Sequence, residues 1–166
     1  MKKYFKNGQA YLVIAFVMMG VLFFSSSQTY TQQSQVSLLS KLLANEPFKE
    51  QLSQIKFLYA GGPVSIEASG YFKFVEFFIR KGAHFLSYFI LGGSFFLGLQ
   101  PRLKQLGLSS LFAWLAATGY AGLDEFHQLM TGGRSALIED VALDSLGALT
   151  AIILLVSVSL VKRLRK

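Results

Sequence analysis

The sequence contains no cysteine and few charged residues, and each shortage excludes a class of protein. Without cysteine the chain forms no disulfide, offers no thiol nucleophile and holds no cysteine-bound zinc. Charged residues make up 15% of the chain and hydrophobic residues 52%, including 16 phenylalanines. Together with a mean hydropathy of +0.45, this balance indicates a membrane protein. The length of 166 residues fits one domain, so we assign 1–166 to a single membrane domain.

Four apolar segments approach the length that a membrane span requires. A spanning helix needs about 20 apolar residues, because the hydrocarbon layer is about 30 Å thick and each residue rises about 1.5 Å. The first segment is short and follows three lysines, a pattern also typical of a cleaved signal peptide, so its cleavage stays open. We predict an all-α integral membrane four-helix bundle whose spans cover about 10–26, 80–99, 107–124 and 141–161.

Acidic residues are absent from the segments that face the cytoplasm if the N-terminus is inside. The charged residues of these segments are all basic: Lys2, Lys3, Lys6, Arg102, Lys104, Lys162, Arg163, Arg165 and Lys166. Since positively charged segments stay cytoplasmic, we predict that both the N- and the C-terminus are cytoplasmic. Nearly all of the excess behind the net charge of +7 therefore belongs to the predicted cytoplasmic ends, where it sets the orientation of the chain. Because the basic residues flank the spans instead of forming one soluble face, no nucleic-acid partner is expected.

The predicted extracytoplasmic loop between spans 1 and 2 covers 27–79. Apolar residues recur at helical spacing in two of its stretches: Val36, Leu39, Leu42 and Leu43, then Phe48, Leu52, Ile55 and Leu58. The pattern predicts one or two amphipathic helices, which either lie at the membrane interface or pack on the bundle as a lid. Gly61, Gly62 and Pro63 then end the helical stretch.

Small residues on the last three spans predict close packing between helices. Glycine and alanine let two backbones approach each other within a membrane. The residues concerned are Gly92, Gly93, Gly119, Gly122, Gly147, Ala148 and Ala151.

Polar and ionisable residues gather at the outer ends of the same three spans. A charged side chain at the bilayer centre costs about 2.5 to 3.5 kcal/mol on insertion scales, so each one is expected to have a partner or a function. The second and fourth spans begin at the outer level and the third ends there. We predict an outward-facing polar pocket formed by Lys81, His84, Tyr88, Asp124, Glu125, Gln128, Arg134, Asp140 and Asp144.

Two interpretations of this polar layer remain open. In the first, Lys81 and Arg134 pair with phosphate or carboxylate groups of a ligand. In the second, the layer is a structural ion-pair network that needs no ligand. Lys81 then pairs with Asp124 or Asp144, and Arg134 pairs with Glu125.

Catalytic chemistry has weaker support in the sequence. His84 is the better candidate for proton transfer, because an imidazole changes charge near neutral pH, whereas His127 is expected to form an interfacial hydrogen bond. No spacing of these residues matches a strong metal motif, so neither a metal nor a cofactor is predicted. Ser87 and Ser135 are lone hydroxyls without a nucleophile elbow. The sequence therefore assigns no catalytic residue and favours a non-enzymatic protein.

The combination of these residues resembles the VanZ-like family, small multi-pass bacterial membrane proteins named for a teicoplanin-resistance protein. The resemblance covers most of the chain outside the outer loop. It rests on the stretch from Phe24 to Gln28, on Lys81, His84 and Tyr88, on Asp124, Glu125 and Gln128, and on Gly133, Arg134, Asp140, Asp144 and Gly147.

The resemblance implies a multi-pass protein of the bacterial plasma membrane, linked to lower glycopeptide susceptibility but to no established reaction. We expect the polar pocket to bind an anionic cell-envelope component, either a membrane lipid headgroup or a cell-wall precursor. One alternative is a membrane enzyme that uses histidine or carboxylate acid–base chemistry on a lipid-linked envelope substrate. The other is a structural or partner-binding protein. The oligomeric state stays open.

Overall fold

The computed structural model describes residues 7–131 and 136–165, and its main elements are four long helices. Each of them is long and apolar enough to cross a membrane. This arrangement confirms the predicted all-α, multi-pass membrane bundle. The four helices are α2 (Gln9–Ser26), α7 (Tyr71–Leu103), α8 (Leu106–Thr131) and α9 (Ile138–Leu164).

The outer surface of the bundle is apolar, as a lipid-facing surface must be. The helix α2 contains no charged residue, and Val13 and Phe16 on it are 61% and 64% exposed. Leu123 on α8 and Leu154 on α9 are exposed by 64% and 53%. Helices with apolar side chains on their exposed faces are stable in lipid and not in water. The apolar composition of these helices therefore explains both why they can cross a membrane and why their exposed faces suit lipid.

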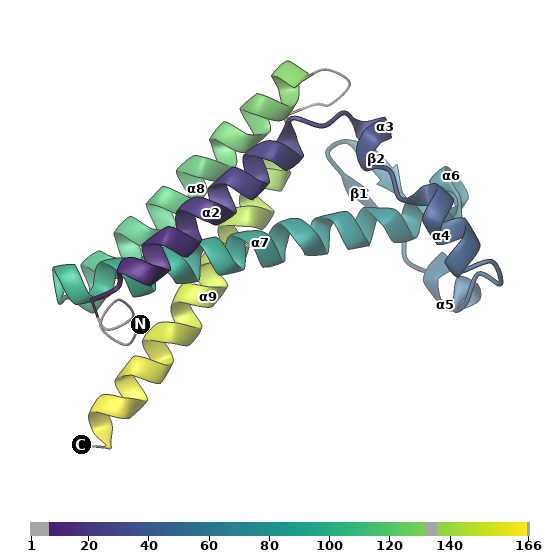
Figure 1. The fold of residues 1–166 in the computed structure, drawn as a ribbon. Coiled ribbons are helices and arrows are strands. Elements are labelled where there is room, and N and C mark those ends of the chain that lie inside the picture. The colour runs from purple at the N-terminus through teal and green to yellow at the C-terminus, as the bar shows by residue number, and fades with distance from the viewer. Residues whose placement is uncertain (1–6, 132–135, 166) are drawn as a thin grey trace.

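The helix α7 crosses the bundle and packs against the other three long helices (Figure 1). Its contact with α9 is close, because a Cβ atom built on Gly92 would lie 2.6 Å from the Cβ of Ala148. Gly147 of α9 likewise packs directly on the backbone of α7. In contrast, a Cβ atom built on Gly119 or Gly122 would meet no described atom within 4 Å, so the packing role predicted for these two glycines is wrong.

The helix α7 is longer than the predicted second span. It begins at Tyr71 and not near residue 80, and its 33 residues extend about 50 Å at about 1.5 Å per residue. The hydrocarbon layer is only about 30 Å thick, so α7 is longer than a helix perpendicular to the membrane needs to be. Tyr71 and Phe74 in its first turns are buried, because the segment between α2 and α7 packs on them.

The segment between α2 and α7, which we call the outer loop after its predicted side, contains more structure than the predicted one or two amphipathic helices. The strands β1 and β2 pair in an antiparallel hairpin, with Phe57 opposite Val64. Its turn residues, Ala60 and Gly61, both have positive φ, the combination that short hairpin turns favour. The pattern of apolar residues missed this hairpin because each strand has three residues. The loop elements are α3 (Tyr30–Gln33), α4 (Val36–Leu42), α5 (Lys49–Ser53), β1 (Phe57–Tyr59), β2 (Gly62–Val64) and α6 (Ile66–Ser69).

The loop elements surround the amino-terminal half of α7, away from the other end of the bundle (Figure 1). The first turn of α2 lies toward that other end, near the connection between α7 and α8, and the last turn of α9 also points away from the loop elements. The helix α7 therefore connects the membrane bundle to the outer loop. Side chains in the middle of α7 contact both parts.

Candidate functional site

The structure divides the predicted polar layer into two clusters, one turn apart along α7. In the outer cluster, the ammonium group of Lys81 forms an ion pair with Asp140 of α9. The hydroxyl group of Tyr59 in β1 donates a hydrogen bond to the same carboxylate oxygen. The predicted pairing of Lys81 with Asp124 or Asp144 is therefore wrong. The outer cluster joins α7, α9 and the hairpin.

Tyr59 attaches the hairpin to this cluster in two ways. Its ring centroid lies 4.7 Å from the Nζ atom of Lys81, in addition to its hydrogen bond with Asp140. Burial and the neighbouring carboxylate raise the pKa of Tyr59 above its usual value, so the hydroxyl stays a donor. Sequence reasoning missed Tyr59, because only the hairpin places this loop residue next to α9.

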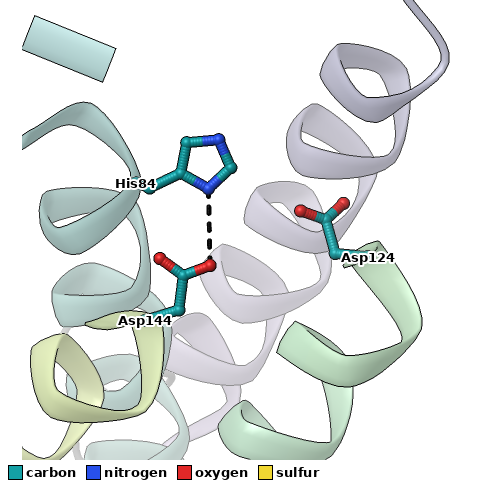
Figure 2. A group of neighbouring side chains, drawn as sticks. All are labelled: His84, Asp124 and Asp144. Atoms are coloured by element: carbon teal, nitrogen blue, oxygen red, sulfur yellow. Dashed lines mark hydrogen bonds and ion pairs between the residues drawn. The ribbon is translucent and has the colours of Figure 1, made fainter. Parts of the chain in front are cut away.

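The inner cluster consists of His84, Asp144 and Asp124, on α7, α9 and α8. The Nδ1 atom of His84 lies 3.3 Å from Oδ2 of Asp144. Figure 2 shows the carboxyl group of Asp124 directed toward the other two side chains. One nitrogen or oxygen atom from each of the three residues lies within 4.8 Å of the others. Asp144 is completely buried and Asp124 is 4% exposed.

Only some of the buried polar atoms in this layer form hydrogen bonds. Oδ2 of Asp124 accepts a bond of 3.2 Å from the amide of Gln128, and Oε2 of Glu125 accepts one of 3.0 Å from the backbone of Leu137. Arg134, the predicted partner of Glu125, lies outside the described residues. The following buried atoms have no hydrogen-bond partner in the described part of the chain: Oδ1 of Asp124, Oε1 of Glu125, Oδ1 of Asp144 and the hydroxyl oxygen of Tyr88.

His127 performs a separate, structural role. Its Nδ1 atom lies 2.8 Å from the hydroxyl oxygen of Ser26, and its ring stacks on Phe23 with centroids 4.4 Å apart. Both partners belong to α2, so His127 joins α2 to α8. The hydrogen-bonding role predicted for His127 is confirmed.

Two clefts open beside α7 at the level of these clusters. One has a volume of about 410 Å³, and we call it the glutamine-lined cleft. Its polar lining comprises Ser25, Gln28, Gln32, Gln33, Ser34, Gln35, Arg80 and His84. The other has a volume of about 380 Å³, and we call it the basic cleft. Its polar lining comprises Tyr30, Tyr59, Ser69, Lys73, Glu76, Arg80 and Lys81. Arg80 lines both clefts.

Sequence reasoning missed three charged residues at the basic cleft. Glu76 is 2% exposed and accepts hydrogen bonds from the hydroxyl of Tyr30, at 3.2 Å, and from the backbone of Gln35. The guanidinium carbon of Arg80 lies 5.0 Å from the ring centroid of Tyr30, and its buried Nη1 atom has no partner among the described residues. Lys73 is exposed. The available signal was the recurrence of charges at helical spacing within an aromatic run.

A comparison with known families assigns the chain to one of them. A family model described as VanZ/LLP1 matches residues 11–161. The chain belongs to the VanZ/LLP1 family. The matched range includes both polar clusters and all of α7 and α8, and it confirms the resemblance noted from the sequence. No curated protein and no solved structure matches the chain.

The VanZ/LLP1 chain thus combines two kinds of chemistry on one helix. The outer part of α7 presents cations to a cleft, which suits an anionic ligand. The next part presents an imidazole to two buried carboxylates, which suits a proton or a cation.

Proposed function

We propose that this VanZ/LLP1 protein binds the phosphate-bearing headgroup of an envelope lipid in the basic cleft. The buried Nη1 atom of Arg80 carries the proposal, because it is a charged donor without a partner among the described residues. Leaving a buried donor unsatisfied costs about 1–3 kcal/mol, and more when it is charged. A phosphate oxygen that accepts from Arg80 removes this cost.

The charges along α7 support an extended anionic ligand. Lys73 and Arg80 are seven residues apart, so they lie on one face of the helix about 10.5 Å from each other. Within the described part of the chain, no carboxylate lies within 4.0 Å of either side chain's nitrogen atoms. The acid in this cleft, Glu76, is already engaged by Tyr30 and the backbone. Two cations are therefore available to the ligand.

The position of the cleft supports a lipid as the source of the phosphate. Here α7 passes from the bundle into the loop, where a membrane meets water. Phe78 and Ile79, next to Arg80, are 43% and 41% exposed and offer contact to an acyl chain. With the predicted orientation, the cleft faces outward from the bacterial plasma membrane, where a membrane phospholipid and a lipid-linked cell-wall precursor both present phosphate.

Binding of labelled phospholipid and of lipid-linked wall precursor to the purified protein in neutral-lipid nanodiscs tests the proposal. We expect Arg80→Gln and Lys73→Gln each to weaken binding about tenfold or more, because a charge-assisted hydrogen bond contributes about 1.5–3 kcal/mol. Lys49→Gln is the matched control, since Lys49 pairs with Glu46 at the surface of the loop. Equal affinity of wild type and Arg80→Gln for both lipids would refute the proposal.

Teicoplanin tolerance provides a cellular readout of the same prediction. We expect wild type and Lys49→Gln to raise the inhibitory concentration of teicoplanin in a susceptible bacterium, and Arg80→Gln not to raise it at the same membrane abundance. Glycopeptides act on wall precursors at the outer face, where the cleft is proposed to bind its ligand. If Arg80→Gln and Lys49→Gln raise teicoplanin tolerance equally, lipid binding in the basic cleft is not the cause of resistance.

One observation favours a second function, an enzyme acting on a lipid-linked envelope substrate. His84 borders the glutamine-lined cleft and is bonded to Asp144, an arrangement that orients an imidazole for acid–base chemistry. Turnover of the bound lipid by the wild-type nanodiscs, lost in His84→Gln, would establish it. The third alternative, a structural or partner-binding protein, requires Arg80→Gln and Lys73→Gln to leave lipid binding unchanged, and any loss of tolerance to follow lower protein abundance.

A further inference from the structure

We propose that His84, Asp124 and Asp144 bind one divalent transition-metal cation where α7, α8 and α9 meet. Their candidate donor atoms lie within 4.8 Å of one another. Donor atoms about 2.1 Å from a tetrahedral cation are about 3.4 Å apart, so small side-chain rotations bring all three into contact with one ion. Figure 2 shows the three side chains converging from three helices.

Unpartnered atoms around the three residues point independently to a ligand. Asp144 is completely buried and Asp124 is 4% exposed, and Oδ1 of each carboxylate lacks a partner among the described residues. The hydroxyl group of Tyr88 is also unpartnered and completely buried, one turn from His84 on the same face of α7. Buried polar atoms in native proteins nearly always have partners, and a cation with its bound water supplies them here.

Among the described residues, the buried carboxylates in and beside the inner cluster outnumber the basic groups near them. Asp124, Glu125 and Asp144 are all buried. Within the described part of the chain, His84 is the basic residue within 4.0 Å of any of them, because the ammonium group of Lys81 pairs with Asp140 in the outer cluster. Buried charges in proteins are paired or coordinate metals. A divalent cation compensates two of the three negative charges.

The donor set indicates the class of cation. An imidazole nitrogen with two carboxylate oxygens suits Zn²⁺ or Mn²⁺ better than Ca²⁺ or Mg²⁺, which prefer oxygen ligands alone. Three protein ligands leave coordination positions for water or another oxygen donor. His84 borders the glutamine-lined cleft, which provides a path for the ion from solution.

The sequence predicts no metal here, because the spacing of these residues matches no metal-binding motif. His84 and Asp124 are 40 residues apart, and Asp124 and Asp144 are 20 residues apart. Because the three ligands lie on three helices, they form no local sequence motif. The inference does not depend on headgroup binding, because the basic cleft uses Arg80 and Lys73 and neither is a metal ligand.

Metal content of the full-length protein tests the proposal. The protein is stripped with a chelator in detergent, dialysed against Zn²⁺ or Mn²⁺ and measured by elemental analysis. We expect one cation per wild-type chain and an affinity at least tenfold lower in His84→Gln, Asp124→Asn and Asp144→Asn. Two matched controls should keep wild-type affinity: His127→Gln, which changes the other histidine of the chain, and Glu139→Gln, which changes an exposed carboxylate of α9.

Spectroscopy and thermal unfolding distinguish loss of metal binding from poor folding of a variant. Co²⁺ bound to the wild type should show visible absorption typical of nitrogen and oxygen ligation. Zn²⁺ should raise the unfolding temperature of the wild type but not that of Asp144→Asn. Without metal, Asp144→Asn should unfold at the wild-type temperature or above it. A wild-type chain that keeps no stoichiometric cation, or binding that survives all three substitutions, overturns the proposal.

Discussion

Lys81 shows how a single cation can connect distant parts of the chain. Its ammonium group pairs with Asp140 of α9 and lies 4.7 Å and 5.5 Å from the ring centroids of Tyr59 and Phe77. The side chain of Lys81 is 23% exposed and that of Asp140 is 16% exposed, so solvent screens the pair only partly. A partly buried, hydrogen-bonded pair holds its geometry better than an exposed one. Lys81 is therefore a positioning residue for the outer loop as well as part of the basic cleft.

The bond from Tyr59 to Asp140 should contribute measurably to stability. We expect Tyr59→Phe to lower the free energy of unfolding by about 1.5–3 kcal/mol, because the acceptor is charged. Tyr71→Phe is the comparison, since Tyr71 donates to the neutral carbonyl of Pro47 at 2.9 Å and its loss should cost only about 0.5–1.5 kcal/mol. Thermal unfolding in detergent measures both. A double-mutant cycle of Tyr59→Phe with Asp140→Asn that shows no coupling would contradict the interpretation.

At the scale of elements, α7 and α9 form the central contact of the bundle. Gly92 and Ala148 meet there with no room for an additional methyl group, and Gly147 packs on the backbone of α7. In lipid, helices associate through such close packing, because burying apolar surface gains little against lipid tails. The same contact fixes the spacing of His84 and Asp144, which lie on these two helices.

Enlarging Gly92 should therefore destabilise the bundle. We expect Gly92→Ala to lower the free energy of unfolding by about 1–3 kcal/mol, the usual effect of overpacking. Gly119→Ala is the matched control in α8: its new methyl group meets no described atom within 4 Å, and alanine favours a helix by about 0.5–1 kcal/mol over glycine. Denaturation in mixed detergent micelles measures the difference. Equal stability of Gly92→Ala and Gly119→Ala would show that moving α7 away from α9 at this contact costs no free energy.

At the scale of the whole molecule, the clusters, the two clefts and the outer loop lie at one end of the bundle. Two of the basic residues predicted to be cytoplasmic, Arg102 and Lys104, lie at the other end, where α7 ends and α8 begins. Arg102 there donates from Nη1 to the backbone carbonyl of Gly98 at 2.6 Å, close to the last turn of α7. The orientation of the chain decides whether the clefts face the envelope or the cytoplasm.

The absence of cysteine makes this orientation directly testable. Gln54→Cys, in the outer loop, and Gln105→Cys, between α7 and α8, change two exposed glutamines in a background without other thiols. We expect a membrane-impermeant maleimide to label the first variant in intact cells and the second only after permeabilisation. The wild-type chain is the unlabelled control. Labelling of Gln105→Cys alone in intact cells would mean that the clefts face the cytoplasm.

The sequence alone determined the membrane class, the four helices and the family, because each depends on composition, apolar length or residue identity. It also placed Lys81, His84, Asp124, Asp140 and Asp144 at comparable depth, since the end of the span on which a residue lies follows from the order of the spans.

Only the tertiary structure decided which of these residues meet. The pairing of Lys81 with Asp140, and of His84 with Asp144, depends on the rotation and spacing of α7 against α9, which the packing at Gly92 sets. The hairpin places Tyr59 beside α9, and the loop segments form the two clefts beside Arg80. Both arrangements depend on contacts between segments far apart in the chain. Periodicity reports which face of a helix a residue occupies, whereas partners across helices are selected by packing between them.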